Sequence, residues 1–264
     1  MSILDAITVS VDEAPRITIY GVGGIGKSTL ASNFPDPLFI LTEKTGLSGI
    51  KKIDPTASFA EMWENIKNLL ALEELPFKTI VIDGLSRLDE MIGNHILDKE
   101  VPGKNGKKAT SLVTACGGYG AGFQAAQQIH RSFKAMMDKF QRRDVTVIYI
   151  GHLTTIKYKA PDMEDYDKYS ITMSNDKCRE PYINDVDAVL LCRTKSFVTE
   201  TESGRSLIRS TGNLIIDATI NDAHVSKNRF GIKSEIPMSF EELSKYIPFY
   251  NKFNEDELIK EELL

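Results

Sequence analysis

Short apolar runs alternate along the chain with longer stretches in which apolar residues recur every three or four positions. The runs are too short for helices, and most are continuously apolar, which is typical of strands covered on both faces of a sheet. Four such strands are predicted, at residues 16–20, 37–42, 79–83 and 145–150.

The stretches between these runs have the spacing of amphipathic helices. One helix is predicted from Lys27 to Phe34, where Pro35 stops it, and Ser58 with Glu61 forms a capping box that starts another. A third helix follows Asp83. A fourth helix is predicted over 122–143. The apolar residues that define the second helix are Phe59, Met62, Trp63, Ile66, Leu69 and Leu70. Those of the third are Leu85, Leu88, Ile92 and Ile96, and those of the fourth are Phe123, Ala126, Ile129, Phe133, Met137 and Phe140.

Strands that alternate with helices predict an α/β fold with a mainly parallel central sheet, right-handed crossovers and helices on both faces. Later runs at 188–193, 213–216 and 223–226, with a hairpin turn near Ser203 and Gly204, predict antiparallel strands toward the C-terminus. We expect residues 1–250 to form a single domain with its core at about 16–246, followed by an acidic tail at 251–264.

Two polar segments interrupt this alternation. Residues 99–120 are rich in glycine and lysine, and residues 154–184 combine lysines with an acidic patch. Loops of this length are usually functional or disordered, so both are expected to lie outside the sheet, and the first is expected to be mobile.

Composition narrows the class of protein. The chain has 264 residues, of which 42% are hydrophobic, enough for one large α/β core. Cys116, Cys178 and Cys192 lie far apart without C-x-x-C spacing, so the sequence suggests neither a zinc site nor a disulfide framework. No apolar run approaches the roughly 20 residues of a membrane span, and the acidic N-terminus is unlike a signal peptide. We therefore expect a soluble cytoplasmic protein with no membrane partner.

The net charge of −5 argues against a protein that binds nucleic acid over its whole surface. It leaves open a small basic channel within an acidic protein. Charge alone therefore does not decide the partner.

The strongest chemical signal is a phosphate-binding loop. Residues 21–28 match G-x-x-x-x-G-K-[ST] in full, directly after a predicted strand and before a predicted helix. Glycines in such a loop let backbone N–H groups surround the β-phosphate, the lysine reaches the β- and γ-phosphates, and the hydroxyl binds Mg²⁺. ATP and Mg²⁺ are therefore the expected ligands, held by Gly21, Gly23, Gly24, Ile25, Gly26, Lys27, Ser28 and Thr29.

Two acidic residues follow strands that would end beside this loop. Asp83 ends the run 79–83, where a carboxylate would emerge at the carboxyl edge of the sheet, and it is predicted to hold Mg²⁺ through water, together with Ser28. Glu43 follows the run 37–42 and is a candidate general base for the attacking water. The spacing fits a solvated surface glutamate equally well.

Glu43, Asp83 and His152, each placed after a successive strand, resemble the RecA-like branch of the P-loop proteins. The resemblance implies that His152 senses the γ-phosphate and relays its state to a DNA-binding loop. Glutamine is common at that position, so histidine is a departure, although it can still donate a hydrogen bond to phosphate. The alternative is a histidine with a structural role at a strand end.

Lys227-Asn228-Arg229 resembles the K-x-K or K-x-R element of RecA and of the hexameric replicative helicases. The resemblance implies that Lys227 and Arg229 reach into the ATP site of a neighbouring subunit. A cation supplied in this way stabilises the transition state of phosphoryl transfer and makes hydrolysis depend on assembly. Self-association into a ring or filament is therefore expected.

Across about 16–246 the layout resembles the Sak-type single-strand annealing proteins of phages, which have a minimal RecA-like core, and related AAA proteins. The resemblance implies an ATPase that binds single-stranded DNA and anneals or pairs strands in phage recombination, in the host cytoplasm, with a single-strand DNA-binding protein as a further partner. The motifs that carry it are Gly-Val-Gly-Gly-Ile-Gly-Lys-Ser-Thr-Leu-Ala at 21–31, Leu-Phe-Ile-Leu-Thr-Glu at 38–43, Thr-Ile-Val-Ile-Asp-Gly at 79–84, Gly-Tyr-Gly-Ala-Gly at 118–122 and Ile-Gly-His at 150–152.

In RecA-like proteins, the DNA channel is lined by the two loops that correspond to the interrupting segments. Lysines that track a backbone, combined with an aromatic residue that stacks a base, suit single-stranded DNA. The alternatives are lysines kept only for solubility, and an assembly ATPase or nucleotide-controlled switch with a protein partner. The candidate DNA-binding residues are Lys104, Lys107, Lys108, Lys157, Tyr158 and Lys159.

Overall fold

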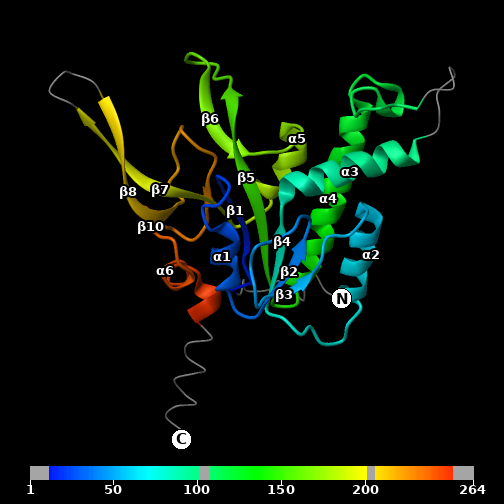
Figure 1. The fold of residues 1–264 in the computed structure, drawn as a ribbon, viewed down its shortest axis with the longest axis horizontal. Coiled ribbons are helices and arrows are strands. Elements are labelled where there is room, and N and C mark those ends of the chain that lie inside the picture. Colours follow the sequence, from blue (N-terminus) through cyan, green and yellow to red (C-terminus); the bar gives the residue numbers. More distant parts are fainter. Residues whose placement is uncertain (1–11, 101–107, 201–205, 252–264) are drawn as a thin grey trace, which may run out of the picture.

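The computed structural model describes residues 12–100, 108–200 and 206–251. The strands of these residues form one sheet with the order β10-β8-β7-β1-β5-β4-β2-β3, and β6 and β9 pair with β5 and β7 outside that path (Figure 1). The strands are β1 (Arg16–Gly21), β2 (Pro37–Leu41), β3 (Lys51–Ile53), β4 (Thr79–Asp83), β5 (Thr146–Tyr158), β6 (Tyr166–Ile171), β7 (Ala188–Glu200), β8 (Ser206–Asp217), β9 (Lys227–Asn228) and β10 (Ile236–Pro237).

The sheet is parallel from β3 to β7 and antiparallel at β8 and β10. Strand β5 lies between β1 and β4, so that Gly21 is beside His152 and Asp83 is beside Ile150. The predicted fold class is confirmed, and its topology brings the ends of β1, β4 and β5 together.

Helices cover both faces of the sheet (Figure 1). One apolar core lies under α2, α3 and α4, and the other lies under α1 and α6. The helical segments are α1 (Lys27–Ser32), α2 (Phe59–Leu70), α3 (Leu85–Lys99), α4 (Ala121–Gln141), α5 (Asp176–Arg179) and α6 (Phe240–Ser244), with 3₁₀ turns η2 (Ala115–Gly117) and η3 (Glu180–Tyr182).

The four predicted helices are present. Ser58 caps α2 by accepting a hydrogen bond from the Glu61 N–H at 3.2 Å, as the capping box predicts. The Glu61 carboxylate accepts from the Ala57 N–H at 3.0 Å rather than from the cap residue itself. Helix α1 ends at Ser32, two residues before the predicted end.

The prediction of a long loop over 154–184 is wrong. Strand β5 continues to Tyr158, and β6 returns beside it in an antiparallel hairpin, pairing Leu153 with Ile171 and Tyr158 with Tyr166. This hairpin extends beyond the rest of the sheet (Figure 1). Helix α5 and turn η3 follow it.

Two predictions for the C-terminal strands also need correction. Strand β7 is antiparallel to β8 as expected but parallel to β1, so it extends the parallel part of the sheet. Residues 223–226 form only one isolated bridge, between His224 and Tyr169, and the next strand is the two-residue β9.

Other predictions fall on residues that the structure does not describe. Residues 101–107 of the first polar segment, the expected turn at Ser203 and Gly204, and residues 252–264 of the tail lie outside the described ranges. Within those ranges, no helix has both the length and the apolar character needed to cross a membrane.

Candidate active site

The phosphate-binding loop connects β1 to α1 and depends on glycine at two positions. Gly24 and Gly26 have φ angles of 75° and 98°, in the left-handed region where only glycine is free of strain. A Cβ on Gly23 or Gly24 would meet nothing within 4 Å, so the loop backbone is open on that side. A phosphate group can therefore approach the backbone closely.

Lys27 opens α1, and its ammonium group is turned back onto the loop. Its Nζ donates to the carbonyls of Gly21 and Val22 at 3.0 and 2.9 Å, and the residue is buried. Burial lowers the pKa of Lys27, while the nearby Cys192, Asp83 and Glu43 oppose that change. Phosphate oxygens would offer this buried cation charge-assisted acceptors in place of two neutral carbonyls, so Lys27 fits a phosphate ligand.

Ser28 and Asp83 form a pair of oxygen donors next to Lys27. Both side chains line one pocket. Burial raises the pKa of Asp83, and the nearby Ser28 hydroxyl lowers it in part. Mg²⁺ binds to carboxylate and hydroxyl oxygens and retains several waters. The two side chains therefore fit the predicted Mg²⁺ site.

Glu43 and His152 complete one pocket with these residues. The pocket has a volume of about 290 Å³ and is lined by Lys27, Ser28 and Asp83 as well as by both of these side chains. His152 Nε2 lies 3.4 Å from Glu43 Oε1, and the two side chains are 43% and 53% exposed. Both groups are therefore accessible to a water molecule or a phosphate. Their catalytic roles remain predictions.

Sequence reasoning missed the residues that hold Asp83 in place. The Thr42 hydroxyl is 2.9 Å from both the Asp83 and the Gly84 carbonyl oxygens, which ties the end of β2 to the end of β4. Gly84 has a φ of 112°, and a Cβ there would lie 2.3 Å from Thr42 Oγ1. The only signal in the sequence is a threonine before Glu43 and a glycine after Asp83.

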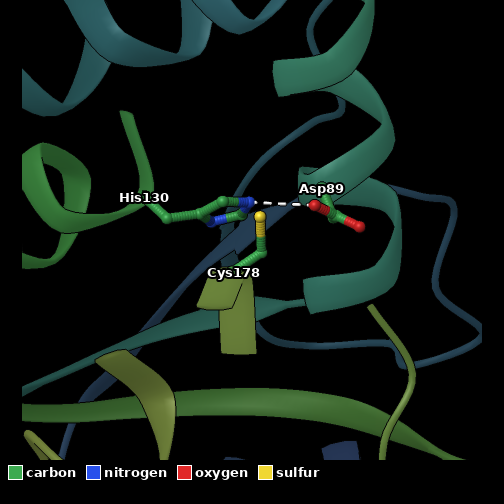
Figure 2. Close-up of side chains that lie close together, drawn as sticks. All are labelled: Asp89, His130 and Cys178. Carbon is green, nitrogen blue, oxygen red and sulfur yellow. Dashed lines mark hydrogen bonds and ion pairs between the residues drawn. The ribbon is translucent and has the colours of Figure 1, made fainter. Parts of the chain in front are cut away.

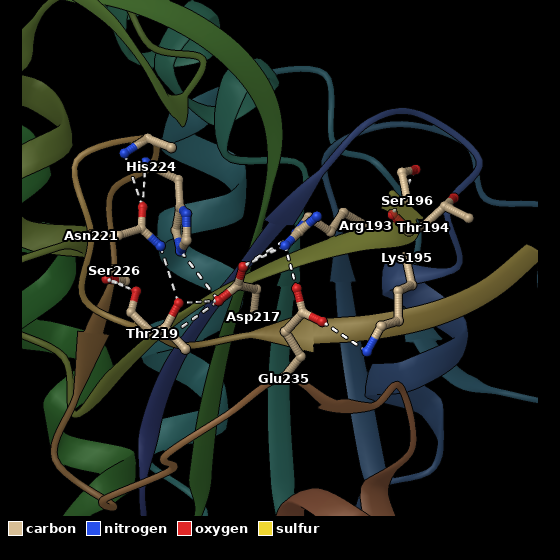
Figure 3. A network of polar contacts seen from close by, with 11 residues as sticks. Arg193, Thr194, Lys195, Ser196, Asp217, Thr219, Asn221, His224, Ser226 and Glu235 are labelled. Carbon is tan, nitrogen blue, oxygen red and sulfur yellow. Dashed lines mark hydrogen bonds and ion pairs between the residues drawn. The ribbon is translucent and has the colours of Figure 1, made fainter. Parts of the chain in front are cut away.

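A polar network connects β7, the end of β8 and the segments that follow β8 (Figure 3). Arg193, next to Cys192 on β7, contacts Asp217 and Glu235, and Lys195 also contacts Glu235. Burial alone would raise the pKa of Asp217, but hydrogen bonds from Thr219 and Arg193 hold it below its usual value. A Cβ on Gly21 would lie 2.4 Å from the Cys192 carbonyl oxygen, so the loop begins tightly against β7.

Lys227 and Arg229 lie away from the pocket of their own chain. Lys227 Nζ contacts the Asn184 carbonyl, and Arg229 Nη1 lies 2.9 Å from Asp187 Oδ1. Asp187 also pairs with Arg16 at the start of β1, whereas the phosphate-binding loop follows the end of that strand. Any contact of Arg229 with an ATP site therefore requires a second copy, and this role remains a prediction.

Only part of the candidate DNA-binding set lies within the described residues. Lys104 and Lys107 lie outside the described residues, and Lys108 is exposed. Lys157, Tyr158 and Lys159 lie at the far end of β5 and line a second pocket of about 470 Å³. Lys168 Nζ, from β6, is 5.5 Å from the centre of the Tyr158 ring, at cation–π distance.

One comparison with known proteins, the family match, agrees with the nucleotide chemistry. A family model described as an AAA domain matches residues 13–230. No curated protein matches the chain. Among solved structures, the KaiC-like protein PH0186 from the hyperthermophilic archaeon Pyrococcus horikoshii OT3 is 13% identical over 78% of this chain and 87% of its own, with a TM-score of 0.36.

Proposed function

Because this chain belongs to the AAA domain family, whose P-loop members are ATPases, we propose that it hydrolyses ATP and couples hydrolysis to binding of single-stranded DNA. Under this proposal, the chain is a recombination or annealing ATPase of the phage Sak type, and it works as a ring or filament. It has single-stranded DNA as its main partner.

One observation carries this proposal: the nucleotide pocket and the hairpin share a strand. His152 lines the pocket, Lys157 and Tyr158 follow it on the uninterrupted β5, and Lys159 comes directly after that strand. Lys157 comes five residues after His152, which is about 17 Å along an extended strand. A change at the phosphate can thus reach the hairpin through a single element.

In the pocket, each side chain has a distinct role. Lys27 binds the β- and γ-phosphates, and Glu43 orients and activates the attacking water. His152 donates a hydrogen bond to the γ-phosphate. Ser28 and Asp83 hold Mg²⁺, which neutralises phosphate charge. Arg229 of a neighbouring copy adds a positive charge as the transition state forms.

On the hairpin, Lys168 lies near the half-exposed ring of Tyr158, and Lys157 and Lys159 line the same pocket. Within the described residues, none of these lysines forms an ion pair, so their charges are available to phosphates. A strand of DNA would lay its backbone along the lysines and stack a base on the ring. Affinity would then fall steeply with added salt.

The test is an ATPase assay with and without single-stranded DNA, on the wild type, Lys27→Ala and the double variant Lys157→Ala/Lys159→Ala. Lys67→Ala, which removes an exposed lysine from α2, is the control. We expect DNA to raise turnover in the wild type and the control, Lys27→Ala to have no turnover, and the double variant to retain basal turnover without the DNA response. If DNA changes neither turnover nor ATP affinity in the wild type, the DNA part of the proposal is wrong.

A nucleotide-controlled assembly ATPase with a protein partner is the second candidate. Three large apolar side chains are exposed on or beside the hairpin, namely Tyr158 at 45%, Met163 at 56% and Tyr169 at 46%. Exposed aromatic and methionine residues are common at protein interfaces. ATP-dependent assembly that is unaffected by DNA, measured by mass, would favour this candidate.

A further inference from the structure

Three potential metal ligands meet in the interior between α3, α4 and α5. They are Asp89, His130 and Cys178, one from each helix (Figure 2). The side chains of His130 and Cys178 are fully buried, and Asp89 is 7% exposed. One ligand atom from each residue lies within 4.8 Å of the other two. We propose that these three side chains bind a zinc ion.

The spacing of the ligand atoms suits zinc. Asp89 Oδ1 lies 3.0 Å from His130 Nε2. Tetrahedral zinc, with bonds of about 2.0–2.3 Å, keeps its ligand atoms about 3.4 Å apart. The oxygen and nitrogen are thus already near the required separation. The sulfur needs to move by about 1.4 Å at most, which rotation of the Cys178 side chain can supply.

Further hydrogen bonds hold the ligands in orientation. The Tyr182 hydroxyl lies 2.9 Å from His130 Nδ1, which leaves Nε2 facing Asp89 and Cys178. The Ser174 N–H donates to Asp89 Oδ2 at 2.5 Å, which leaves Oδ1 facing the cluster. Partners of this kind fix ring and carboxylate orientation in protein zinc sites.

The donor atoms favour zinc over the Mg²⁺ expected in the active site. Mg²⁺ prefers oxygen ligands, whereas zinc accepts sulfur, nitrogen and oxygen together. A Cys178 thiolate and the Asp89 carboxylate would carry two negative charges, which balance Zn²⁺ in a place with little water. On binding, a sulfur–zinc bond forms and the thiol proton leaves to solvent. The Ser174 hydroxyl, 3.1 Å from Asp89 Oδ1, would donate a hydrogen bond to this ligand oxygen.

Bound zinc would stabilise the junction behind the active site. Helix α3 begins two residues after Asp83, and the segment that leads to Cys178 directly follows β6 of the hairpin. Zinc would therefore hold the segment after β6 against α3, the helix that follows Asp83. This role does not depend on the hairpin binding DNA.

The cluster has a metal-free alternative, which the experiment must exclude. His130 bridges Asp89 and Tyr182 by hydrogen bonds, and this relay satisfies the ring without any ion. In that case Cys178 is a neutral thiol packed beside the relay, and the cluster only provides internal polar contacts.

The test measures zinc in the full-length protein, purified from zinc-supplemented cells without chelator and freed of any affinity tag. We expect about one zinc per chain in the wild type, by elemental mass spectrometry. Cys178→Ser should lose this zinc, and Cys116→Ser, which alters an exposed cysteine, should keep it. Tyr182→Phe should weaken zinc binding by roughly 10–100-fold without abolishing it.

A spectroscopic measurement on the wild type covers the case in which Cys178→Ser does not fold. Replacing zinc with Co²⁺ should give thiolate-to-cobalt absorption bands and the visible bands of tetrahedral cobalt. A wild-type protein that contains no zinc and shows no such bands with added Co²⁺ overturns the proposal. Equal zinc content in Cys178→Ser and Cys116→Ser overturns it as well.

Discussion

At the scale of single residues, the candidate active site is assembled from one short motif and from side chains at strand ends. Lys27 and Ser28 are fixed by the spacing of one short motif. Glu43, Asp83 and His152 converge because the carboxyl ends of parallel strands meet at one edge of the sheet. The contact of Thr42 with Gly84 was not predictable, since it depends on which strands are neighbours.

Glu43→Gln tests the proposed general base. It keeps the size of the side chain but cannot take a proton, so ATP binding should persist while turnover falls by about 10²-fold or more. Binding of a fluorescent ATP analogue and steady-state phosphate release measure the two effects. Glu64→Gln, on the exposed surface of α2, is the control. Unchanged turnover in Glu43→Gln would identify Glu43 as a surface glutamate.

Gly84→Ala tests the backbone that positions Asp83. The added methyl group would lie 2.3 Å from Thr42 Oγ1, at a φ angle of 112° that alanine adopts only with strain. We expect a loss of about 1–3 kcal/mol in the free energy of unfolding, measured with urea. Gly46→Ala has open space around its Cβ and should change stability little. Equal effects of the two substitutions would contradict this account.

At the scale of elements, the continuously apolar strands and amphipathic helices were predictable, and the hairpin was not. The outer part of β5 and most of β6 are half-exposed and carry lysines, tyrosines and aspartates. They lack the apolar alternation by which strands are recognised, so they look like a loop. The direction of β7 was missed because periodicity identifies a strand but not its orientation, which α5 and η3 set by returning the chain to the start of β1.

Asp187 lies directly before β7 and contacts residues at the start of β1 and after β9. Its contribution to the stability of the fold should depend on pH. It accepts bonds from Arg16 at the start of β1 and from Arg229 after β9. Burial alone would raise the pKa of Asp187, but the Arg16 hydrogen bonds outweigh it and hold the pKa below the usual 3.8. The stabilisation is therefore complete above that value and is lost as the pH falls through the lowered pKa.

Asp187→Asn should accordingly lower the free energy of unfolding by about 1–3 kcal/mol near neutral pH. The difference from the wild type should shrink as the pH falls below 3.8, where the wild-type carboxyl begins to take up its proton. Urea unfolding across pH 2.5–7 measures this difference in the free energy of unfolding. Asp98→Asn, which changes an exposed residue, is the control. A difference independent of pH would rule out the charge as its origin.

At the scale of the whole molecule, features formed by distant segments were beyond sequence reasoning. Asp89, His130 and Cys178 are separated by 41 and 48 residues along the chain and show no ligand spacing, which is why the sequence suggested no zinc site. The placement of Arg229 at the edge of the sheet opposite the nucleotide pocket is likewise a product of topology. The expected subunit contact remains a prediction.

Arg229→Ala tests whether a neighbouring copy completes the site. ATP binding by single protomers should be unchanged, and the rise of specific activity with protein concentration should disappear. Activity and mass measured over the same concentration range separate catalysis from assembly. Asp187→Asn, which removes the negative charge that Arg229 pairs with, is the comparison. If it removes the concentration dependence equally, Arg229 has only a structural role.

Because β5 is continuous from the pocket to the hairpin, it restricts the insertions and deletions that this part of the chain can accept. Successive side chains on a strand point to opposite faces, so inserting one residue between His152 and Lys157 would turn every later side chain over. The lysines and Tyr158 would then exchange faces, and the pairing with β6 would shift. Relatives that retain both the pocket and the hairpin should therefore differ in this interval by an even number of residues, or should contain a β-bulge that restores the faces.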